Sequence, residues 1–486
     1  MLLVNSLTLI LLANHLGASD FGMFSFALAV GGISSQLAGL GLECVIVMNC
    51  SRDRRRVEVE LGNALAVRFL ASGLIIAFIL VWLWVAQAKG EMAVVIPVVT
   101  TSLSLAMVAN PLLTSVFRAV GDIRVPWALL LGQSLGFCAG VLLCKRWGWG
   151  VEGVSWVHLT TNVFLFVLLM IRVLSQFRPR LSLRVMKENL WLGFIFNLNQ
   201  CISMLRAASG QLVLQWVRAS RALGEYAVGL RIANGFNVLP SAIQTVYLPS
   251  LHAAQTLEKQ VSLFAKLFRL TIVSGGLVLG MVFWAADDVV AVLFSREYTR
   301  SAEVLKILAV WLLINFISYP YSMLAEAVRK VGQRCFAQTI STVVAIVSGF
   351  CLVRWLGSVG AALSDCIASF VLFTHYNVIL GRLAFSALCL RKNLGAFIAI
   401  VAASICVCGV RLLLPHGIER IICITATYGI VYVAVCLGSK VLTSADLAFG
   451  RLVVHTGSAI AEAPSHLDST KHEGSQPHEG GCNPSK

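Results

Sequence analysis

Long apolar runs separated by short polar or basic stretches make up most of this chain. Fourteen runs are long enough, or nearly so, to cross a hydrocarbon layer as a helix, which takes about 20 residues. In chain order they cover residues 1–13, 22–48, 63–86, 93–117, 126–144, 151–173, 190–217, 226–248, 267–286, 304–328, 335–353, 359–380, 394–414 and 418–437. The pattern predicts an all-α polytopic membrane protein with fourteen transmembrane helices.

The first of these runs is too short to cross a bilayer unaided. It has neither the basic leading region nor the small-residue cleavage site that marks a signal peptide. We therefore expect a full first helix whose beginning lies upstream of Met1, so that the first helix is clipped in this sequence.

Lys and Arg concentrate in the loops that follow even-numbered runs. Twenty of them lie in these loops, whereas nine lie in the loops after odd-numbered runs. Because basic loops stay in the cytoplasm, this bias predicts that both termini are cytoplasmic, in agreement with an even number of spans.

Composition excludes a soluble protein. The chain of 486 residues is 58% hydrophobic and 13% charged, with a mean hydropathy of +0.83. Its net charge of +15 is explained by bilayer topology, so we predict no nucleic-acid partner. The fourteen Cys lie mostly inside apolar runs, and only Cys406 and Cys408 are close in sequence, so we predict no metal site.

Three short motifs recur in the same order at nearly one offset. Leu16-Gly17 recurs as Leu223-Gly224, Arg118 with Gly121 recurs as Arg329 with Gly332, and Arg146-Trp147 recurs as Arg354-Trp355. By subtraction the offsets are 207, 211 and 208 residues. Parallel repeats of this kind predict two six-helix units of the same orientation, with a substrate site at their interface.

These features divide the chain into five parts. We predict an N-terminal six-helix bundle, a basic linker, a C-terminal six-helix bundle, two further transmembrane helices and a disordered cytoplasmic tail, at residues 1–175, 176–189, 190–385, 386–442 and 443–486. The linker interleaves basic and apolar residues. It is either an amphipathic segment on the anionic leaflet or a solvated tether.

The apolar stretch from 190 to 251 carries an unusual number of polar side chains. On a helical period Asn199, Ser203 and Arg206 share one side of its first helix, and Arg231, Asn234 and Gln244 share one side of its second. Guanidinium and amide groups are costly at membrane depth unless they face protein or water. We predict that these six residues line a substrate cavity, whose positive charge favours an anionic cargo.

Other interpretations of these residues remain open. Arg206 or Arg231 could instead close an interhelical salt bridge, for example with Glu43, and the amides could serve interhelical hydrogen bonding. Arg68 is a further candidate for substrate binding, or else extends to the cytoplasmic surface. Glu43 is the candidate for ion coupling or gating, with a plain helix-end carboxylate as the alternative.

The chain resembles the Wzx-type oligosaccharide flippases of the MOP exporter superfamily. The resemblance rests on LGASDFGMFSFALAV, GLGLE, ALGEYAVGLRIANGFNVLPSAIQTVYLPSL and VLFSREYTRSAEVLKILAV, in the family's order, and extends to about Gly438. It implies two six-helix bundles in a V, fourteen helices in all, and alternating access. The implied cargo is an undecaprenyl-pyrophosphate-linked oligosaccharide, moved to the outer leaflet of the bacterial inner membrane.

The same resemblance implies an H⁺ or Na⁺ gradient as energy source, no bound cofactor, and a polysaccharide polymerase and chain-length regulator as partners besides membrane lipid. The product would be O-antigen, capsule or exopolysaccharide. The clipped first helix leaves open any cavity group that this helix normally supplies.

The sequence leaves three alternative functions to consider. A multidrug exporter of the superfamily would favour an acidic cavity, whereas the intramembrane charges here are largely basic. A peptidoglycan-precursor exporter shares fold and cargo chemistry. A polytopic polysaccharide polymerase is disfavoured because no long external loop, paired carboxylates or phosphate-binding loop is present in the sequence. We predict that the protein is not an enzyme.

Overall fold

The computed structural model describes residues 2–52, 56–85, 87, 90–120, 124–254, 256–387, 390–415, 417–439 and 441, and throughout these residues the secondary structure is helical. The predicted C-terminal tail lies outside the described residues. Eleven described helices are long and apolar enough to cross a membrane. The fold is therefore all-helical and polytopic, as the sequence predicts.

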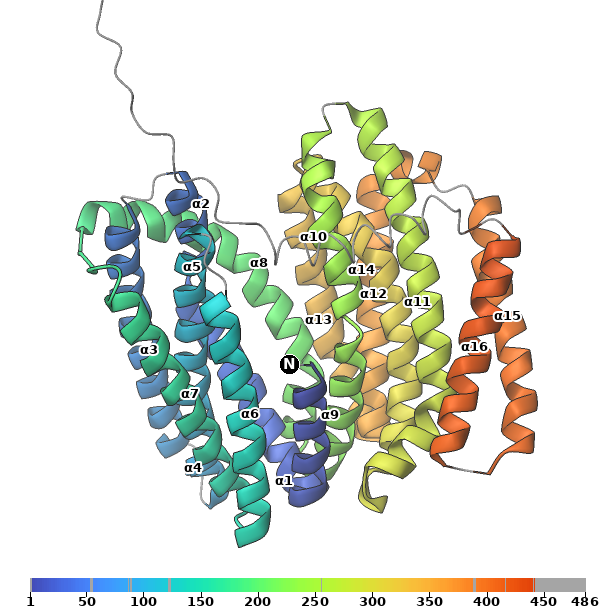
Figure 1. The fold of residues 1–486 in the computed structure, drawn as a ribbon, viewed down its shortest axis with the longest axis horizontal. Helices are drawn as coiled ribbons and strands as arrows, with labels where there is room; N and C mark the ends of the chain where they lie inside the picture. The colour runs from blue at the N-terminus through green and yellow to red at the C-terminus, as the bar shows by residue number, and fades with distance from the viewer. Residues whose placement is uncertain are drawn as a thin grey trace, which may run out of the picture. The chain divides into compact units, whose positions relative to one another are not determined.

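The first seven helices belong to the N-terminal half of the chain. They are α1 (Leu2–Gly39), α2 (Leu42–Arg52), α3 (Val57–Val85), α4 (Glu91–Met107), α5 (Thr114–Val120), α6 (Arg124–Trp147) and α7 (Val151–Leu174). A π-helical turn, η2 (Val108–Leu113), joins α4 to α5 at Pro111, where the ring removes a backbone donor. Figure 1 shows α2 to α7 together on one side.

The second half begins with α8 (Leu183–Trp216). It continues with α9 (Ser220–Gly235), α10 (Val238–Ala253), α11 (Leu257–Leu293), the short 3-10 helix η3 (Arg296–Tyr298), α12 (Ser301–Ala327), α13 (Val331–Leu356) and α14 (Ser358–Ala387). The helices α15 (Leu390–Leu413) and α16 (Ile418–Gly438) follow. In Figure 1, α10 to α16 lie on the side opposite α2 to α7, with α1, α8 and α9 between.

Two of the predicted spans are broken in the structure. The first two predicted runs correspond to the two parts of α1 on either side of Gly17, where the backbone adopts φ 75° and the helix is interrupted. The second run is not continuous to residue 48, because Leu40 and Gly41 have positive φ and α2 starts afresh at Leu42. The eighth run is divided into α9 and α10, of 16 residues each, at Phe236-Asn237.

One of the internal repeats is visible as equivalent helix ends. Arg146-Trp147 ends α6 and is followed by Gly148 at φ 68°, while Arg354-Trp355 lies in the last turn of α13, before Gly357 at φ 60°. Left-handed glycines commonly end helices in this way. Both halves thus end a helix at an Arg-Trp pair with a glycine of positive φ close behind it.

The linker is packed against the N-terminal half. The Arg180 amide donates to the Glu58 carbonyl at 2.9 Å, and the Ser182 amide donates to Asn63 Oδ1 at 2.9 Å. The Arg180 guanidinium also pairs with the Glu58 carboxylate at 3.0 Å. Residues 178–182 are therefore fixed to the start of α3, and α8 begins at Leu183, inside the predicted linker.

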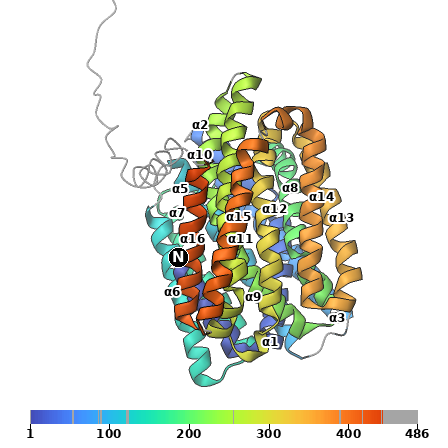
Figure 2. The same ribbon diagram turned by 90° about the vertical axis from the view of Figure 1, so that its right-hand side faces the viewer.

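The helices α15 and α16 dock on α11 through two tyrosines, on the side that faces the viewer in Figure 2. Tyr428 and Tyr432 stack at 5.7 Å, and their hydroxyls donate to the carbonyls of Gly276 and Val273, each at 3.0 Å. A Cβ atom at Gly280 would lie 1.7 Å from Cζ of Tyr428. Gly280 thus opens the space that the Tyr428 ring fills.

Gly280→Val is expected to detach this pair of helices from α11, because the new side chain takes the place of the Tyr428 ring. Overpacking of this kind costs about 1–3 kcal/mol. Thermal unfolding and protease sensitivity of residues 390–413 in detergent measure the effect. Gly409→Val is the matched control, since nothing lies within 4 Å of a Cβ atom built there; equal behaviour of the two variants would contradict the prediction.

Candidate functional site

The residues that the sequence assigns to the site lie in three separate places. Glu43 and Arg68 are inside the N-terminal helices. Asn199, Ser203 and Arg206 lie on α8, and Arg231, Asn234 and Gln244 lie on α9 and α10. Each group has different partners, so each is described separately.

Arg68 lies on α3 and is buried, with 1% of its side chain exposed. Its Nη2 donates to the Ser35 carbonyl at 3.1 Å, and its Nη1 lies 3.8 Å from Oε2 of Glu43. Glu43 therefore pairs with Arg68 rather than with Arg206 or Arg231. This ion pair ties α3 to the break between α1 and α2, and the gating role of Glu43 remains a prediction.

The α8 residues face the C-terminal helices. Ser203 donates to Oε1 of Gln338 on α13 at 2.9 Å, and Arg206 Nη1 donates to Ser369 on α14 at 3.2 Å. Asn199 is half-buried, and its Oδ1 has no hydrogen-bond partner among the described residues. Two of the three side chains thus make hydrogen bonds between helices, and their role in substrate binding remains a prediction.

A buried acid lies beside Arg206. Asp365, on α14, is 6% exposed and accepts a hydrogen bond from the hydroxyl of Tyr226 on α9. The guanidinium of Arg206 is close enough to interact electrostatically with this carboxylate. Ser369, one helical turn from Asp365, donates in turn to Asn315 on α12 at 3.4 Å. Arg206 therefore belongs to a polar network inside the C-terminal half.

Arg231 is in a different environment. Its guanidinium lies 5.8 Å from the centre of the Phe21 ring, a cation–π contact between α9 and α1. Among the described residues no carboxylate lies within 4.0 Å of it. An intramembrane cation without a counterion costs about 2.5–3.5 kcal/mol, so such residues mark functional sites by default.

Arg231 also lines a cavity of about 310 Å³ between α1, α9 and α11. The other lining residues are uncharged, and most are apolar: Ser6, Leu9, Ile10, Ile232, Gly235, Phe236, Val289, Leu293 and Phe294. One fixed positive charge in an apolar pocket suits a ligand that joins an anionic group to a hydrocarbon.

The remaining two residues lie beyond this cavity. Asn234 is exposed and accepts a hydrogen bond from Asn237 at 2.9 Å, which bridges the break between α9 and α10. Gln244 is half-buried on α10. The structure therefore brings Arg231 and Asn234 into one region but separates them from Ser203 and Arg206.

Close to the cavity, the end of α11 and the loop after it form hydrogen bonds with residues around the break in α1. Asn14 Nδ2 donates to the Leu293 carbonyl at 2.8 Å, and the Ala18 amide donates to the Glu297 carboxylate at 3.0 Å. The Tyr298 hydroxyl donates to the Ala13 carbonyl at 2.9 Å. Burial, reinforced by the Glu297 and Asp20 charges, raises the pKa of Tyr298, so this donor stays protonated. Two motifs of the resemblance, LGASDFG and VLFSREYTR, thus contact each other.

Comparison with solved structures identifies the fold. This chain superposes on the lipid II flippase MurJ in its inward closed conformation with a TM-score of 0.69 and 12% identity. The match covers 89% of this chain and 96% of the MurJ chain. A multidrug resistance MATE family transporter of the MOP superfamily, in its inward-facing conformation, matches over 79% of this chain and 95% of the other, with a TM-score of 0.60 and 15% identity.

A third match is a MOP superfamily transporter from Pyrococcus furiosus whose binding pocket is described as having reverse polarity. It covers 78% of this chain and 92% of the other, with a TM-score of 0.50 and 14% identity. No curated protein sequence matches the chain.

The chain therefore has the fold of these solved flippase and transporter structures, and its eleven long apolar helices make it a multi-pass membrane protein. Residues 11–271 match the profile of a family described as polysaccharide biosynthesis protein. This match spans more than half of the chain, so the chain belongs to that family.

Proposed function

We propose that this protein is a lipid-linked oligosaccharide flippase. It translocates undecaprenyl-pyrophosphate-linked glycan units across the bacterial inner membrane for the synthesis of O-antigen, capsule or exopolysaccharide, with an H⁺ or Na⁺ gradient as energy source. Both termini lie in the cytoplasm, and the end of the bundles that carries the Gly17 break faces outward. The family match and the MOP fold support the class of transporter and the connection to polysaccharide.

The observation that carries the proposal is the unpaired guanidinium of Arg231 in its cavity. A lipid pyrophosphate concentrates negative charge next to a hydrocarbon chain, and guanidinium groups bind phosphate with strong, often bidentate hydrogen bonds. The described residues that line the cavity include no carboxylate, which disfavours an organic cation as cargo. Charge and apolar surface together fit a lipid-linked anion.

Arg231→Ala is expected to reduce surface polysaccharide by about ten- to a hundredfold, since hydrogen bonds to charged groups contribute about 1.5–3 kcal/mol. A complementation assay in a flippase-deficient strain measures the glycan, and immunoblotting of membranes measures protein abundance. Arg231→Lys keeps the charge but loses the bidentate geometry, so export should be intermediate.

Arg146→Ala removes an exposed arginine at the end of α6, away from the cavity, and serves as the control. Normal glycan output from Arg231→Ala at normal abundance would exclude Arg231 from cargo binding and remove the main support for the proposal.

A further inference from the structure

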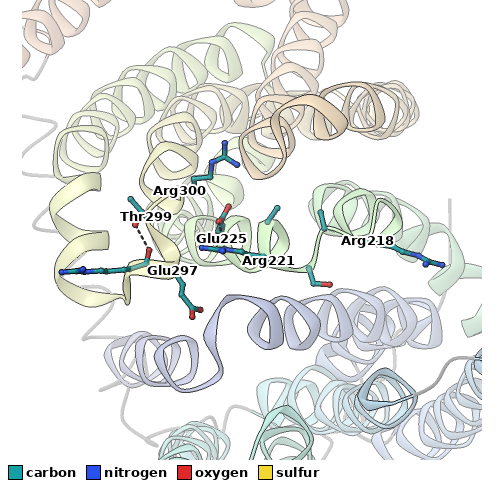
Figure 3. Close-up of a pocket in the computed structure, with 10 residues that line it drawn as sticks. Arg218, Arg221, Glu225, Glu297, Thr299 and Arg300 are labelled. Atoms are coloured by element: carbon teal, nitrogen blue, oxygen red, sulfur yellow. Dashed lines mark hydrogen bonds and ion pairs between the residues drawn. The ribbon is translucent and has the colours of Figure 1, made fainter.

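A second pocket lies at the outward end of the C-terminal half, where α8 meets α9 and α11 leads into α12. It encloses about 760 Å³, within the range of small-ligand sites. Its lining consists of two loop segments and the helix starts that follow them: Arg218, Ala219, Ser220, Arg221, Ala222, Glu225, Arg296, Glu297, Thr299 and Arg300. Figure 3 shows Arg221 and Arg300 on either side of Glu225, with Arg218 at the far edge.

The pocket carries a net positive charge, and its two carboxylates are not free to neutralise the remaining arginines. Four arginines face two glutamates, and both carboxylates are already used by the protein. Glu225 is 5% exposed and accepts a hydrogen bond from Ser358 at 2.8 Å, with Arg221 at 3.8 Å. Glu297 accepts the Ala18 amide at 3.0 Å. Among the described residues, Arg218, Arg296 and Arg300 have no ion-pair partner.

The N-termini of two helices, α9 and α12, lie next to this pocket. The residues that precede α9 and α12 are Ala219 and Arg300, and neither helix has a side-chain cap for its first amides. Alanine is among the poorest residues at this position. Uncapped amides and the helix dipole attract anions, and at the start of α9, which lines the pocket, they add to the arginines; at α12 the Ala302 amide already donates to the Thr299 carbonyl at 3.3 Å.

The arginines are also unexpected for this side of the membrane. The pocket holds four of the nine Lys and Arg residues that the sequence places in loops after odd-numbered runs. Basic residues in outward loops oppose the orientation that the rest of the chain specifies. Their concentration at one pocket indicates a requirement for positive charge there.

We propose that this pocket is a second anion site, which binds a phosphate-bearing group at the outward end of the protein. Arg221, in the pocket, and Arg231, in the inner cavity, are ten residues apart on the continuous helix α9, or about 15 Å along its axis. This assignment of the ligand rests on the proposed function. For the lipid-linked cargo of that function, the two sites form consecutive positions for one pyrophosphate. The phosphate of an outer-leaflet phospholipid has the same chemistry and is distinguished by the test.

The test is calorimetric titration of inorganic pyrophosphate into the full-length protein in phosphatidylcholine nanodiscs. It is done in the Arg231→Ala background, so that the inner cavity does not contribute. Saturable binding is expected, and Arg296→Gln with Arg300→Gln should weaken it at least about tenfold. Arg146→Gln with Arg354→Gln removes the same charge at the same end but outside the pocket, and should change affinity less than about twofold.

Absence of saturable binding would overturn the proposal, and so would equal weakening by the control pair. An unchanged thermal unfolding midpoint establishes that the pocket variant is folded. Nanodiscs that contain phosphatidylglycerol separate the two sources of phosphate: competition with pyrophosphate assigns the site to a lipid headgroup, and unchanged affinity assigns it to cargo. Because binding is measured without export, its failure leaves the flippase proposal intact, and failed export by Arg231→Ala leaves this site intact.

Discussion

Gly224→Val is expected to abolish the accumulation of folded protein in the membrane. A Cβ atom built at Gly224 lies 1.9 Å from the Ala18 carbonyl oxygen and 3.1 Å from the Ala18 Cα atom. Both are backbone atoms, and Ala18 is fixed by its hydrogen bond to Glu297. The clash therefore can be relieved only by separating α1 from α9, which costs more than the usual 1–3 kcal/mol of an overpacked side chain.

Fluorescence-detected gel filtration and the thermal unfolding midpoint measure this effect. Gly224→Ala should give a smaller loss of the same kind. Gly235→Val is the control on the same helix, since nothing lies within 4 Å of a Cβ atom there. A Gly224→Val protein as abundant and as stable as this control would show that α1 and α9 are not in contact in the membrane.

Arg206→Ala is expected to lower both abundance and polysaccharide export severely. The sequence predicts a loss of export alone, because it assigns Arg206 to the cargo. The structure instead gives Arg206 a hydrogen bond to Ser369 and the nearby carboxylate of Asp365, which is 6% exposed. Removing Arg206 breaks the hydrogen bond between α8 and α14, and hydrogen bonds to charged groups contribute about 1.5–3 kcal/mol; it also takes away a cation that favours the charged form of the buried Asp365.

A second substitution separates these two roles. Asp365→Asn removes the uncompensated charge while keeping a group that can accept the Tyr226 hydroxyl. In the double variant with Arg206→Ala, abundance and export should both recover to within a fewfold of wild type. Recovery of abundance without export would instead place Arg206 in contact with cargo, as the sequence predicts.

The fold could be predicted almost entirely from sequence, because hydropathy and loop charge report directly on the bilayer. The breaks within the helices could not be predicted in this way. The breaks at Leu40-Gly41 and Phe236-Asn237 fall inside apolar runs, and only local backbone geometry distinguishes them from continuous helix. Pro111 is the exception, since its missing donor predicts the irregular turn found there.

The candidate site could be predicted only in part, for a different reason. Helical periodicity states which residues share one side of a helix but not which neighbour that side faces. Ser203 and Arg206 do share a side of α8, yet it faces α13 and α14. Arg231 differs because it has no counterion among the described residues, a property that depends on all the neighbouring helices together. The outward pocket cannot be predicted from sequence, because the arginines that line it come from two loops that are far apart in the chain.

The contact between Ala18 and Gly224 has a consequence for how such proteins diverge. It joins main chain to main chain, and the nearby Gly22 approaches the Ser220 carbonyl in the same way. A junction of this kind requires only a glycine at each of these two positions, so the surrounding sequence can change freely. An identity as low as the 12% shared with MurJ is therefore compatible with a junction of this kind.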